Sequence, residues 1–396
     1  MKILFVADAR SPIARNWIRH FVERGDEVFL ASTFDCGLDF PVARFLFIPT
    51  AFSQLKARTS QPGGAPAPMP ASARTLALRA RLRQWMGPLT LPSSARKLRA
   101  FIREVKPDLL HAMRIPYEGM LAAAALEGLA LRPPFLVSVW GNDFTLHAPS
   151  APLMRYFTRR TMKAAGALHT DCRRDARLAQ EWGFDADKPV LVVPGGGGIK
   201  TEIFYPPKQP PKEPVVIQPR GFRAYVNNEA FFKSIPLILE KRGDARFVCP
   251  AMRGEPQAAA WIKELGVEHA VQLKPPCSQA QMGEEFRAAQ ALVSPTTHDG
   301  TPNSLLEGMA CGCFPIAGDL ESIREWVERG KNGLLVNPND PLAIAEAVLT
   351  ALEREDLRRE AAAYNAEVIA ARGGYERNMN LAVEFYKKAQ APKEKK

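Results

Sequence analysis

Short apolar segments alternate with helical segments along most of this chain, and this alternation limits the possible folds more than any other feature. Residues 2–8, KILFVAD, are typical of a buried strand, and Pro12 to Arg24 are typical of a helix. The same order recurs later, where the strand ALVSP over 291–295 leads into a helix that begins near Asn303. Such alternation favours parallel strands, because each helix returns the chain across a face of the sheet. We therefore predict an α/β protein.

The length of 396 residues exceeds what one hydrophobic core usually supports, so we expect two domains. We place them at residues 1–200 and 201–375, followed by a C-terminal helix and tail over 376–396 that could pack back on the first domain. The six cysteines are scattered without metal-ligand spacing, and no signal peptide or long apolar run is present. These features favour reduced thiols and a cytoplasmic location.

Positive charge is concentrated in a basic insertion over residues 53–106, which holds 11 basic residues and one acidic residue. Within it, a helical pattern places Leu78, Leu82 and Trp85 on one apolar face among arginines. Two interpretations stay open. The stretch 72–104 contacts an anionic membrane surface, or the helix packs on its own domain. Nucleic acid is not expected as a partner, because no binding motif accompanies the charge.

The segment 294–319 joins a turn-rich loop to a short helix and contains the most specific pattern of the chain. A helix start offers unpaired backbone N–H groups and a positive dipole end, which together suit a phosphate group. Asp299 precedes the helix and Glu307 lies one turn inside it. Carboxylates on both sides of a phosphate site are suited to hydroxyl groups, and a nucleotide-sugar has hydroxyls on both sides of its diphosphate.

This segment resembles the donor-binding signature of the retaining glycosyltransferases of family 4, which carry two acidic residues eight positions apart before a small-residue run. The resemblance implies the GT-B fold, with two Rossmann-like domains whose parallel sheets face a central cleft. It also implies that Glu307 binds the ribose and that Asp299 is a catalytic residue beside the transferred sugar. Because Pro302 has no N–H, the expected phosphate donors are the amides of Asn303, Ser304 and Leu305.

Two departures from the family pattern affect the expected site. Arg220 matches the family's diphosphate-binding arginine, but Tyr225 stands where the family has lysine, and Arg223 is the candidate replacement. Trp140 stands where a histidine commonly faces the reacting sugar, which leaves Asp143 as the second catalytic candidate. The acceptor-side candidates are Ser11, His111 and Asn142.

The resemblance implies a metal-independent glycosyltransferase without a cofactor, of the kind used in polysaccharide biosynthesis. The expected partners are a nucleotide-sugar donor and a glycan or lipid-linked acceptor, with attachment to the inner face of the membrane left open. Two alternatives remain at this point. One is a nucleotide-sugar-binding scaffold without transfer activity, and the other is a nucleotide-sugar epimerase on the same fold.

Overall fold

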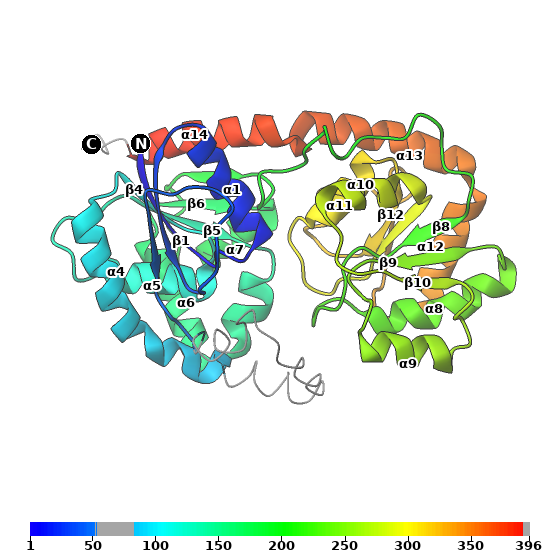
Figure 1. Ribbon diagram of the computed structural model, residues 1–396, viewed down its shortest axis with the longest axis horizontal. Coiled ribbons are helices and arrows are strands. Elements are labelled where there is room, and N and C mark those ends of the chain that lie inside the picture. Colours follow the sequence, from blue (N-terminus) through cyan, green and yellow to red (C-terminus); the bar gives the residue numbers. More distant parts are fainter. Residues whose placement is uncertain (52, 54–82, 391–396) are drawn as a thin grey trace. The chain divides into compact units, whose positions relative to one another are not determined.

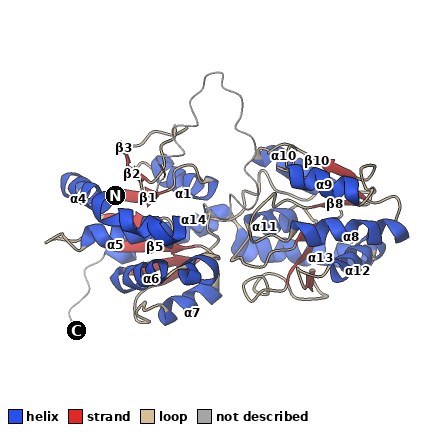
Figure 2. Cartoon of the chain, turned by 90° about the horizontal axis from the view of Figure 1, so that it is seen from below, coloured by secondary structure: helices blue, strands red, loops and turns tan. Residues whose placement is uncertain are grey.

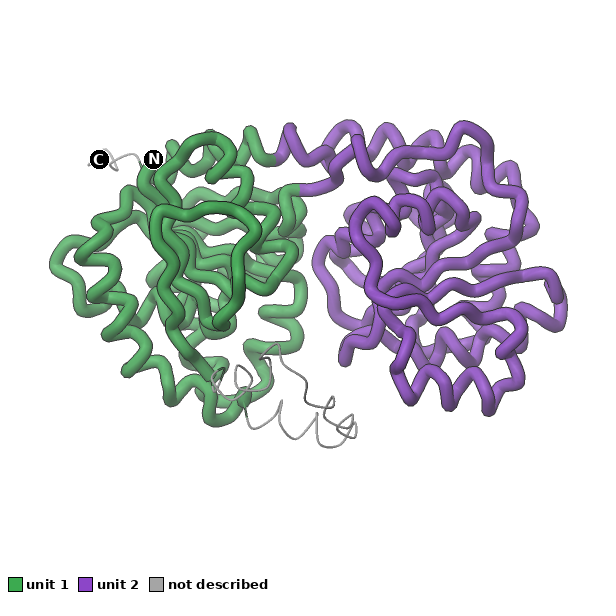
Figure 3. The backbone as a smooth tube through the Cα atoms, viewed as in Figure 1, with its two compact units in different colours: residues 1–197, 379–396 green, residues 198–378 purple. Residues whose placement is uncertain are grey.

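The computed structural model describes residues 1–51, 53 and 83–390, and the chain divides into two compact units (Figure 3). Unit 1 comprises Met1–Gly197 and Met379–Lys396, and unit 2 comprises Gly198–Asn378. Unit 1 is therefore assembled from both ends of the chain.

Unit 1 is built on a seven-stranded parallel sheet in the order β3-β2-β1-β4-β5-β6-β7 (Figure 1). The chain order reverses between the adjacent strands β1 and β4, which is the switch point of a doubly wound sheet. The strands are β1 Lys2–Ala7, β2 Glu27–Ser32, β3 Arg44–Phe47, β4 Leu109–Ala112, β5 Phe135–Val139, β6 Ala167–Thr170 and β7 Val190–Val192.

Helices flank the strands of this sheet on both faces (Figure 2), which is why the central strands are almost wholly apolar. In α1, Ser11 caps the first turn, and the apolar residues Ala14, Trp17 and Phe21 are buried on one side. The helices of unit 1 are α1 Pro12–Glu23, α4 Leu91–Val105, α5 Met120–Leu126, α6 Pro152–Ala164 and α7 Arg173–Glu181, with short turns η1 Gly87–Thr90, η2 Ile115–Gly119, η3 Asp143–His147 and η4 Ala148–Ser150. Helix α14 Tyr375–Gln390 begins in unit 2 and continues into unit 1 from Met379 onward.

The last turns of α14 belong to the core of unit 1. The Trp17 indole N–H donates to the Tyr386 hydroxyl at 2.8 Å, and the same hydroxyl is hydrogen-bonded to Nδ1 of His111. The Tyr386 ring stacks on Phe21 with 4.4 Å between ring centroids. All four side chains are fully buried, so the C-terminal segment is an integral part of this core.

Unit 2 contains a six-stranded parallel sheet in the order β10-β9-β8-β11-β12-β13. Its strands are β8 Val215–Ile217, β9 Arg246–Cys249, β10 Val271–Leu273, β11 Ala291–Ser294, β12 Phe314–Gly318 and β13 Leu334–Val336. Its helices are α8 Asn228–Lys241, α9 Pro256–Glu264, α10 Gln279–Ala288, α11 Asn303–Ala310, α12 Pro341–Glu353 and α13 Glu355–Val368, followed by the turn η5 Ile369–Gly373. The two parallel sheets with their helices confirm the predicted α/β architecture.

Helix α11 lies unusually close to the sheet of unit 2. A Cβ atom at Gly308 would lie 2.1 Å from Cδ2 of Leu292 on β11, so any larger residue would force the Leu292 side chain to move. The predicted helix start near Asn303 is confirmed, because α11 begins at that residue.

Four consecutive glycines, 195–198, mark the chain's passage from unit 1 to unit 2. Gly198 has a φ of +105°, and a Cβ atom there would lie 2.2 Å from the carbonyl oxygen of Gly373. The neighbouring Ile199 N–H donates to that same carbonyl at 2.8 Å. The glycine therefore permits a close approach of two backbone segments.

Part of the basic insertion, residues 54–82, lies outside the described residues. Leu78 and Leu82 of the predicted apolar helix face are among these residues, whereas the later part of the insertion contains α4. Within the described ranges, no helix combines the length and the apolar character that crossing a bilayer requires.

Candidate functional site

The loops that follow the adjacent strands β8 and β11 are joined at the carboxyl edge of the sheet in unit 2. The N–H of Thr297 donates to the carbonyl of Tyr225 at 2.9 Å, and the N–H of Asn227 donates to the carbonyl of Pro295 at 2.9 Å. The carboxyl edge of a parallel sheet is where ligands of doubly wound folds bind. These backbone bonds hold the two loops in a fixed register beside α11.

Arg220 is the central cation of this edge. Its Nη2 lies 2.5 Å from Oδ2 of Asp299, and its Nη1 lies 3.4 Å from the hydroxyl of Ser304. The side chain is 9% exposed, and its buried Nε–H has no hydrogen-bond partner among the described residues. A buried donor without a partner costs free energy, so an anion placed beside this guanidinium would satisfy it.

Buried polar side chains fix the position of Arg220. Oε1 of Gln218 accepts a hydrogen bond from the Arg220 backbone N–H at 2.8 Å, and the Gln218 amide is hydrogen-bonded to Asn228. Asn228 also donates to the carbonyl of Gly221 at 3.3 Å. Gln218 and Asn228 are both buried, so this hydrogen-bond network fixes the backbone of Arg220 and Gly221 in the loop after β8.

The N-terminus of α11 points toward the same group of residues. Pro302 occupies the capping position, and no side chain among the described residues caps the helix. The amides of Leu305 and Leu306 donate to the carbonyl of Pro302 at 3.0 and 3.3 Å. The amides of Asn303 and Ser304 are therefore better placed for a phosphate than the amide of Leu305.

Glu307 lies one turn inside α11 and is partly buried. Burial raises the pKa of its carboxyl to about 7, while the positive charge of Arg220 acts in the opposite direction. The carboxyl can accept hydrogen bonds from two neighbouring hydroxyls when it is ionised. Asp299, Arg220, Ser304 and Glu307 thus form one cluster in unit 2.

Arg223 and Tyr225 extend this cluster along the loop after β8. Nε of Arg223 donates to the carbonyl of Arg220 at 3.0 Å, and its Nη1 lies 3.2 Å from the Tyr225 hydroxyl. The Tyr225 ring in turn lies under the Arg220 guanidinium, with 5.8 Å from Cζ to the ring centroid. The exposed Arg223 is therefore folded back toward Arg220 rather than extended into solvent.

The acidic candidate of unit 1, Asp143, is buried and anchors two loops. It forms an ion pair with Arg114 at 2.8 Å and accepts hydrogen bonds from the backbone N–H groups of Ile115 and Trp140, each at 3.2 Å. Burial raises the pKa of the Asp143 carboxyl, and the Arg114 charge opposes that change. With 1% exposure, Asp143 acts on neighbouring side chains rather than on a ligand directly.

Arg114 is the more accessible member of this pair. Its Nη2 donates to Oδ1 of Asn142 at 2.9 Å, and its guanidinium lies over the Trp140 ring at 5.3 Å. Sequence reasoning missed Arg114, although it lies two residues after the end of β4. Its position at the carboxyl end of that strand was the available signal.

Glu118 is a second residue that sequence reasoning missed. Its carboxyl is buried at the same edge and accepts a hydrogen bond from the Thr33 hydroxyl at 2.6 Å. Burial raises its pKa to about 7, although the hydrogen bond from Thr33 favours the ionised form. The preceding residue, Tyr117, has a φ of 68° and a ψ of −54°, a conformation that non-glycine residues rarely adopt.

Two acceptor-side candidates have structural roles in unit 1. The Ser11 side chain accepts from the Ala14 amide at 3.4 Å and caps α1. His111 is fully buried, with Nδ1 bonded to Tyr386 and Nε2 lying 2.8 Å from the Ser138 hydroxyl. Burial lowers the pKa of His111 well below its usual value, so the ring is neutral. Its place is in the core rather than on a surface that a substrate could reach.

Asp171, Cys172 and Asp175 bring three possible metal-ligand atoms within 4.8 Å of one another in unit 1. Arg174 already forms an ion pair with Asp175 at 2.8 Å, and burial raises the pKa of the Cys172 thiol, which keeps it protonated. A neighbouring guanidinium and a protonated thiol both disfavour a cation. These residues do not make a convincing metal site.

Two family models match the chain along most of its length. Residues 11–196 match the glycosyl transferase 4-like domain, and residues 217–354 match the glycosyl transferases group 1 domain. The second match contains Arg220, Asp299 and Glu307. The chain belongs to the group 1 glycosyltransferases.

Curated relatives of this glycosyltransferase match over part of their length. The D-inositol 3-phosphate glycosyltransferase of Thermomonospora curvata is 34% identical over 123 residues, which are 31% of this chain and 28% of the relative. That of Xylanimonas cellulosilytica is 25% identical over 247 residues, which are 57% of this chain and 58% of the relative. The matches thus span between about a quarter and three fifths of these relatives.

Solved structures match the glycosyltransferase over nearly its whole length. Sucrose-phosphate synthase from Thermosynechococcus elongatus has a TM-score of 0.74 at 13% identity, covering 98% of this chain and 99% of that one. Anabaena HepE, solved in complex with UDP-glucose, has a TM-score of 0.71 at 15% identity, covering 98% and 100%. At these identities the likeness establishes the shared GT-B fold.

Proposed function

We propose that this group 1 glycosyltransferase transfers a sugar from a nucleoside-diphosphate sugar to an acceptor hydroxyl, with retention of anomeric configuration. The observation that carries the proposal is the cluster in unit 2. The partnerless Nε–H of Arg220 lies beside the uncapped start of α11, and the carboxylates of Asp299 and Glu307 belong to the same cluster. This combination suits a diphosphate that has hydroxyl groups on both sides.

In this mechanism, negative charge develops on the leaving diphosphate as the bond to the anomeric carbon breaks. The Arg220 guanidinium and the amides of Asn303 and Ser304 would stabilise that charge in a preorganised site. The reaction would then need no metal ion. By the family resemblance, Asp299 holds the hydroxyls of the sugar and stabilises its developing positive charge, while Glu307 holds the ribose hydroxyls.

The ion pair of Arg220 with Asp299 would place the group that stabilises the leaving diphosphate next to the group that holds the sugar. Arg220 would use its Nε–H and Nη1–H on the phosphates while Nη2 holds the Asp299 carboxylate in place. Arg223, held by Tyr225, would supply the second cation. UDP-glucose bound to Anabaena HepE supports a uridine diphosphate sugar as the first donor to test.

For the acceptor, we propose a glycan or lipid-linked hydroxyl that is bound at the carboxyl edge of unit 1. Arg114, held by Asp143 and Asn142, is the accessible polar group there. Of the basic stretch 72–104, the described part begins at Arg83 and exposes 57% of Trp85 and 44% of Met86. These apolar side chains beside arginines support a peripheral position on the inner face of the membrane.

A thermal-shift screen of nucleotide-sugars on the wild type and on Glu307→Ala tests the donor site. We expect one nucleotide class to raise the Tm of the wild type and to leave that of Glu307→Ala unchanged. Glu346→Ala, which removes an exposed carboxylate from α12, is the matched control and should respond as the wild type does. Equal shifts in wild type and Glu307→Ala would count against the site.

Product analysis then separates transfer from the other reactions of a nucleotide-sugar. We expect release of nucleoside diphosphate that increases with a glycan acceptor, and a product whose anomeric configuration by NMR equals that of the donor. An inverted product would contradict retention. Conversion of the donor without any acceptor would indicate an epimerase, and binding without turnover would indicate a scaffold.

A further inference from the structure

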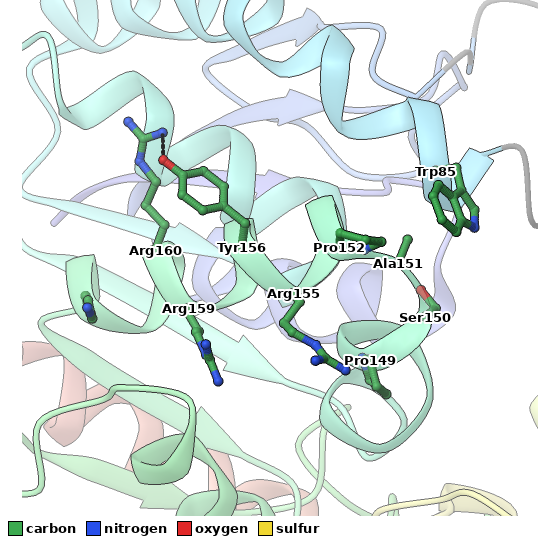
Figure 4. Close-up of a pocket in the computed structure, with 10 residues that line it drawn as sticks. Trp85, Pro149, Ser150, Ala151, Pro152, Arg155, Tyr156, Arg159 and Arg160 are labelled. Atoms are coloured by element: carbon green, nitrogen blue, oxygen red, sulfur yellow. Dashed lines mark hydrogen bonds between the residues drawn. The ribbon is translucent and has the colours of Figure 1, made fainter.

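A groove of about 930 Å³ runs along the outer side of α6 in unit 1 (Figure 4). Its walls are contributed by the loop before α6, by the exposed side of that helix and by one residue that precedes η1. The lining residues are Trp85, Pro149, Ser150, Ala151, Pro152, Arg155, Tyr156, Arg159, Arg160 and Lys163. None of them belongs to the donor cluster.

A row of cations follows this groove. Arg155, Arg159 and Lys163 are spaced four residues apart, so they lie on one side of α6 and extend over about 12 Å. All three are exposed, and no ion pair involves any of them within the described ranges. Arg160 differs, because it is already paired with Glu127. The groove thus contains three cations, Arg155, Arg159 and Lys163, that are available to an anionic ligand.

Aromatic side chains accompany the cations. Trp85 is 57% exposed and Tyr156 is 56% exposed. An exposed aromatic face suits the C–H face of a sugar ring, because the ring face is negative and the sugar hydrogens are weakly positive. Figure 4 shows Trp85 beyond the start of α6 and Tyr156 on the helix itself, on either side of Arg155.

The groove is connected to the acceptor edge of unit 1 by the chain itself. Strand β5 ends at Val139, and the following segment carries Asn142 and Asp143 before it reaches Pro149 at the groove. Because α6 connects β5 to the parallel strand β6, it begins near the carboxyl edge of the sheet and returns to the opposite edge, so the groove along α6 starts near the carboxyl edge. An elongated ligand with one end at the carboxyl edge of the sheet could continue along α6.

We propose that this groove binds an anionic oligosaccharide, whose acidic groups pair with Arg155, Arg159 and Lys163 and whose sugar rings stack on Trp85 or Tyr156. The proposal rests on the proposed function, because it places the acidic part of the acceptor in the groove and the reacting hydroxyl at the sheet edge. Within this groove a bilayer surface is the less favourable ligand, since the cations line a concave groove that a flat surface does not enter. A membrane contact of the stretch 72–104 would then use residues outside the groove, such as the exposed Met86.

Titration of the full chain with hexagalacturonate, and with uncharged maltohexaose of the same length, tests the proposal. We expect hexagalacturonate to bind at least about tenfold more tightly at low ionic strength, and to weaken as salt screens the charges. Binding of both sugars with equal affinity would overturn the role of the cations.

Matched charge variants locate the binding site. We expect Arg155→Gln with Arg159→Gln to weaken hexagalacturonate binding about tenfold or more, and Arg96→Gln with Lys97→Gln on the exposed side of α4 to weaken it less than about twofold. Trp85→Ala should lower affinity for both oligosaccharides. Equal losses of hexagalacturonate affinity in the two double variants would indicate non-specific electrostatic attraction to unit 1 and would contradict binding in the groove.

Vesicle binding distinguishes the membrane from the oligosaccharide. If vesicles containing phosphatidylserine bind through Arg155 and Arg159 while hexagalacturonate does not bind, the groove is a membrane contact and the proposal is wrong. The thermal shift with the donor should be the same in the wild type and in both double variants. Oligosaccharide binding without any donor response in the wild type would contradict the proposed function alone.

Discussion

Nη2 of Arg220 lies 2.5 Å from Oδ2 of Asp299, and the two residues are 79 positions apart in the sequence. The pair links the loop after β8 to the loop after β11 at the place where the donor diphosphate is proposed to bind. Both side chains are largely buried, so the pair is protected from solvent screening. Each partner therefore fixes the orientation of the other.

Removal of the Arg220 guanidinium should impair the chemical step more than donor binding. For Arg220→Ala we expect kcat to fall about 100- to 1000-fold, because the leaving diphosphate loses a preorganised cation. Arg220→Lys should recover part of the rate, since an ammonium keeps the charge but not the planar fork. Steady-state release of nucleoside diphosphate measures the effect. A loss in kcat smaller than about threefold for Arg220→Ala would exclude the proposed role.

Donor affinity should depend on the ionisation of Glu307. Burial raises its pKa to about 7, and ribose hydroxyls donate to the ionised carboxylate. Affinity should then fall as the pH drops below about 7, by up to about tenfold per pH unit. Calorimetric titration of the donor across this range measures the dependence. Glu307→Gln should bind weakly at every pH, and an unchanged pH profile in that variant would assign the dependence to another group.

Glu118 should make the protein less stable as the pH rises. Below its unfolded pKa of 4.5 both states hold the proton, whereas between 4.5 and about 7 only the unfolded chain releases it. The free energy of unfolding should therefore fall by about 3 kcal/mol across this interval. In Glu118→Gln, urea unfolding should show a smaller loss between mildly acidic and mildly alkaline pH. A parallel pH dependence in wild type and variant would contradict the assignment.

The Tyr386 hydroxyl should contribute to the stability of unit 1. Tyr386→Phe leaves the buried Trp17 N–H and one nitrogen of His111 without that partner, so we expect a loss of about 1–3 kcal/mol in the free energy of unfolding. The matched control is Tyr205→Phe, because Tyr205 is 47% exposed. Denaturant unfolding compares the two variants, and equal stabilities would show that the hydroxyl is energetically neutral.

Tyr225 should act through Arg223. Tyr225→Phe removes the hydroxyl that lies 3.2 Å from Nη1 of Arg223, so we expect the KM for the donor to rise about two- to fivefold with little change in kcat. In an Arg223→Ala background the same substitution should have no further effect, because its target is absent. Additive effects of the two substitutions would show that Tyr225 acts independently of Arg223.

The fold was predictable because its signals are local. Each strand of the two sheets is a short apolar run, and the start of α11 at Asn303 follows from the turn-forming residues before it. The positions of Asn303 and Ser304 in the first turn of α11 were also predictable, because these residues are adjacent in the sequence. The family resemblance added the probable neighbours Arg220, Asp299 and Glu307, which local pattern alone does not join.

Contacts between distant segments were not predictable from one sequence. Glu118 and Thr33 are 85 positions apart, and the buried carboxyl appears in the sequence as an ordinary residue between Tyr117 and Gly119. His111 was expected on the acceptor side because it ends a strand, but the partner that buries it, Tyr386, lies 275 positions away. Arg114 was missed for the same reason, since its importance depends on Asp143.

The burial of Tyr386 beside Trp17 also affects how the chain acquires its structure during synthesis. Residues near the N-terminus leave the ribosome long before residue 386, so unit 1 lacks one wall of its core until all of unit 2 and then α14 have been synthesised. Unit 2, by contrast, is one continuous segment and has all of its residues earlier. The half of the enzyme that is translated first is therefore the half that finishes folding last.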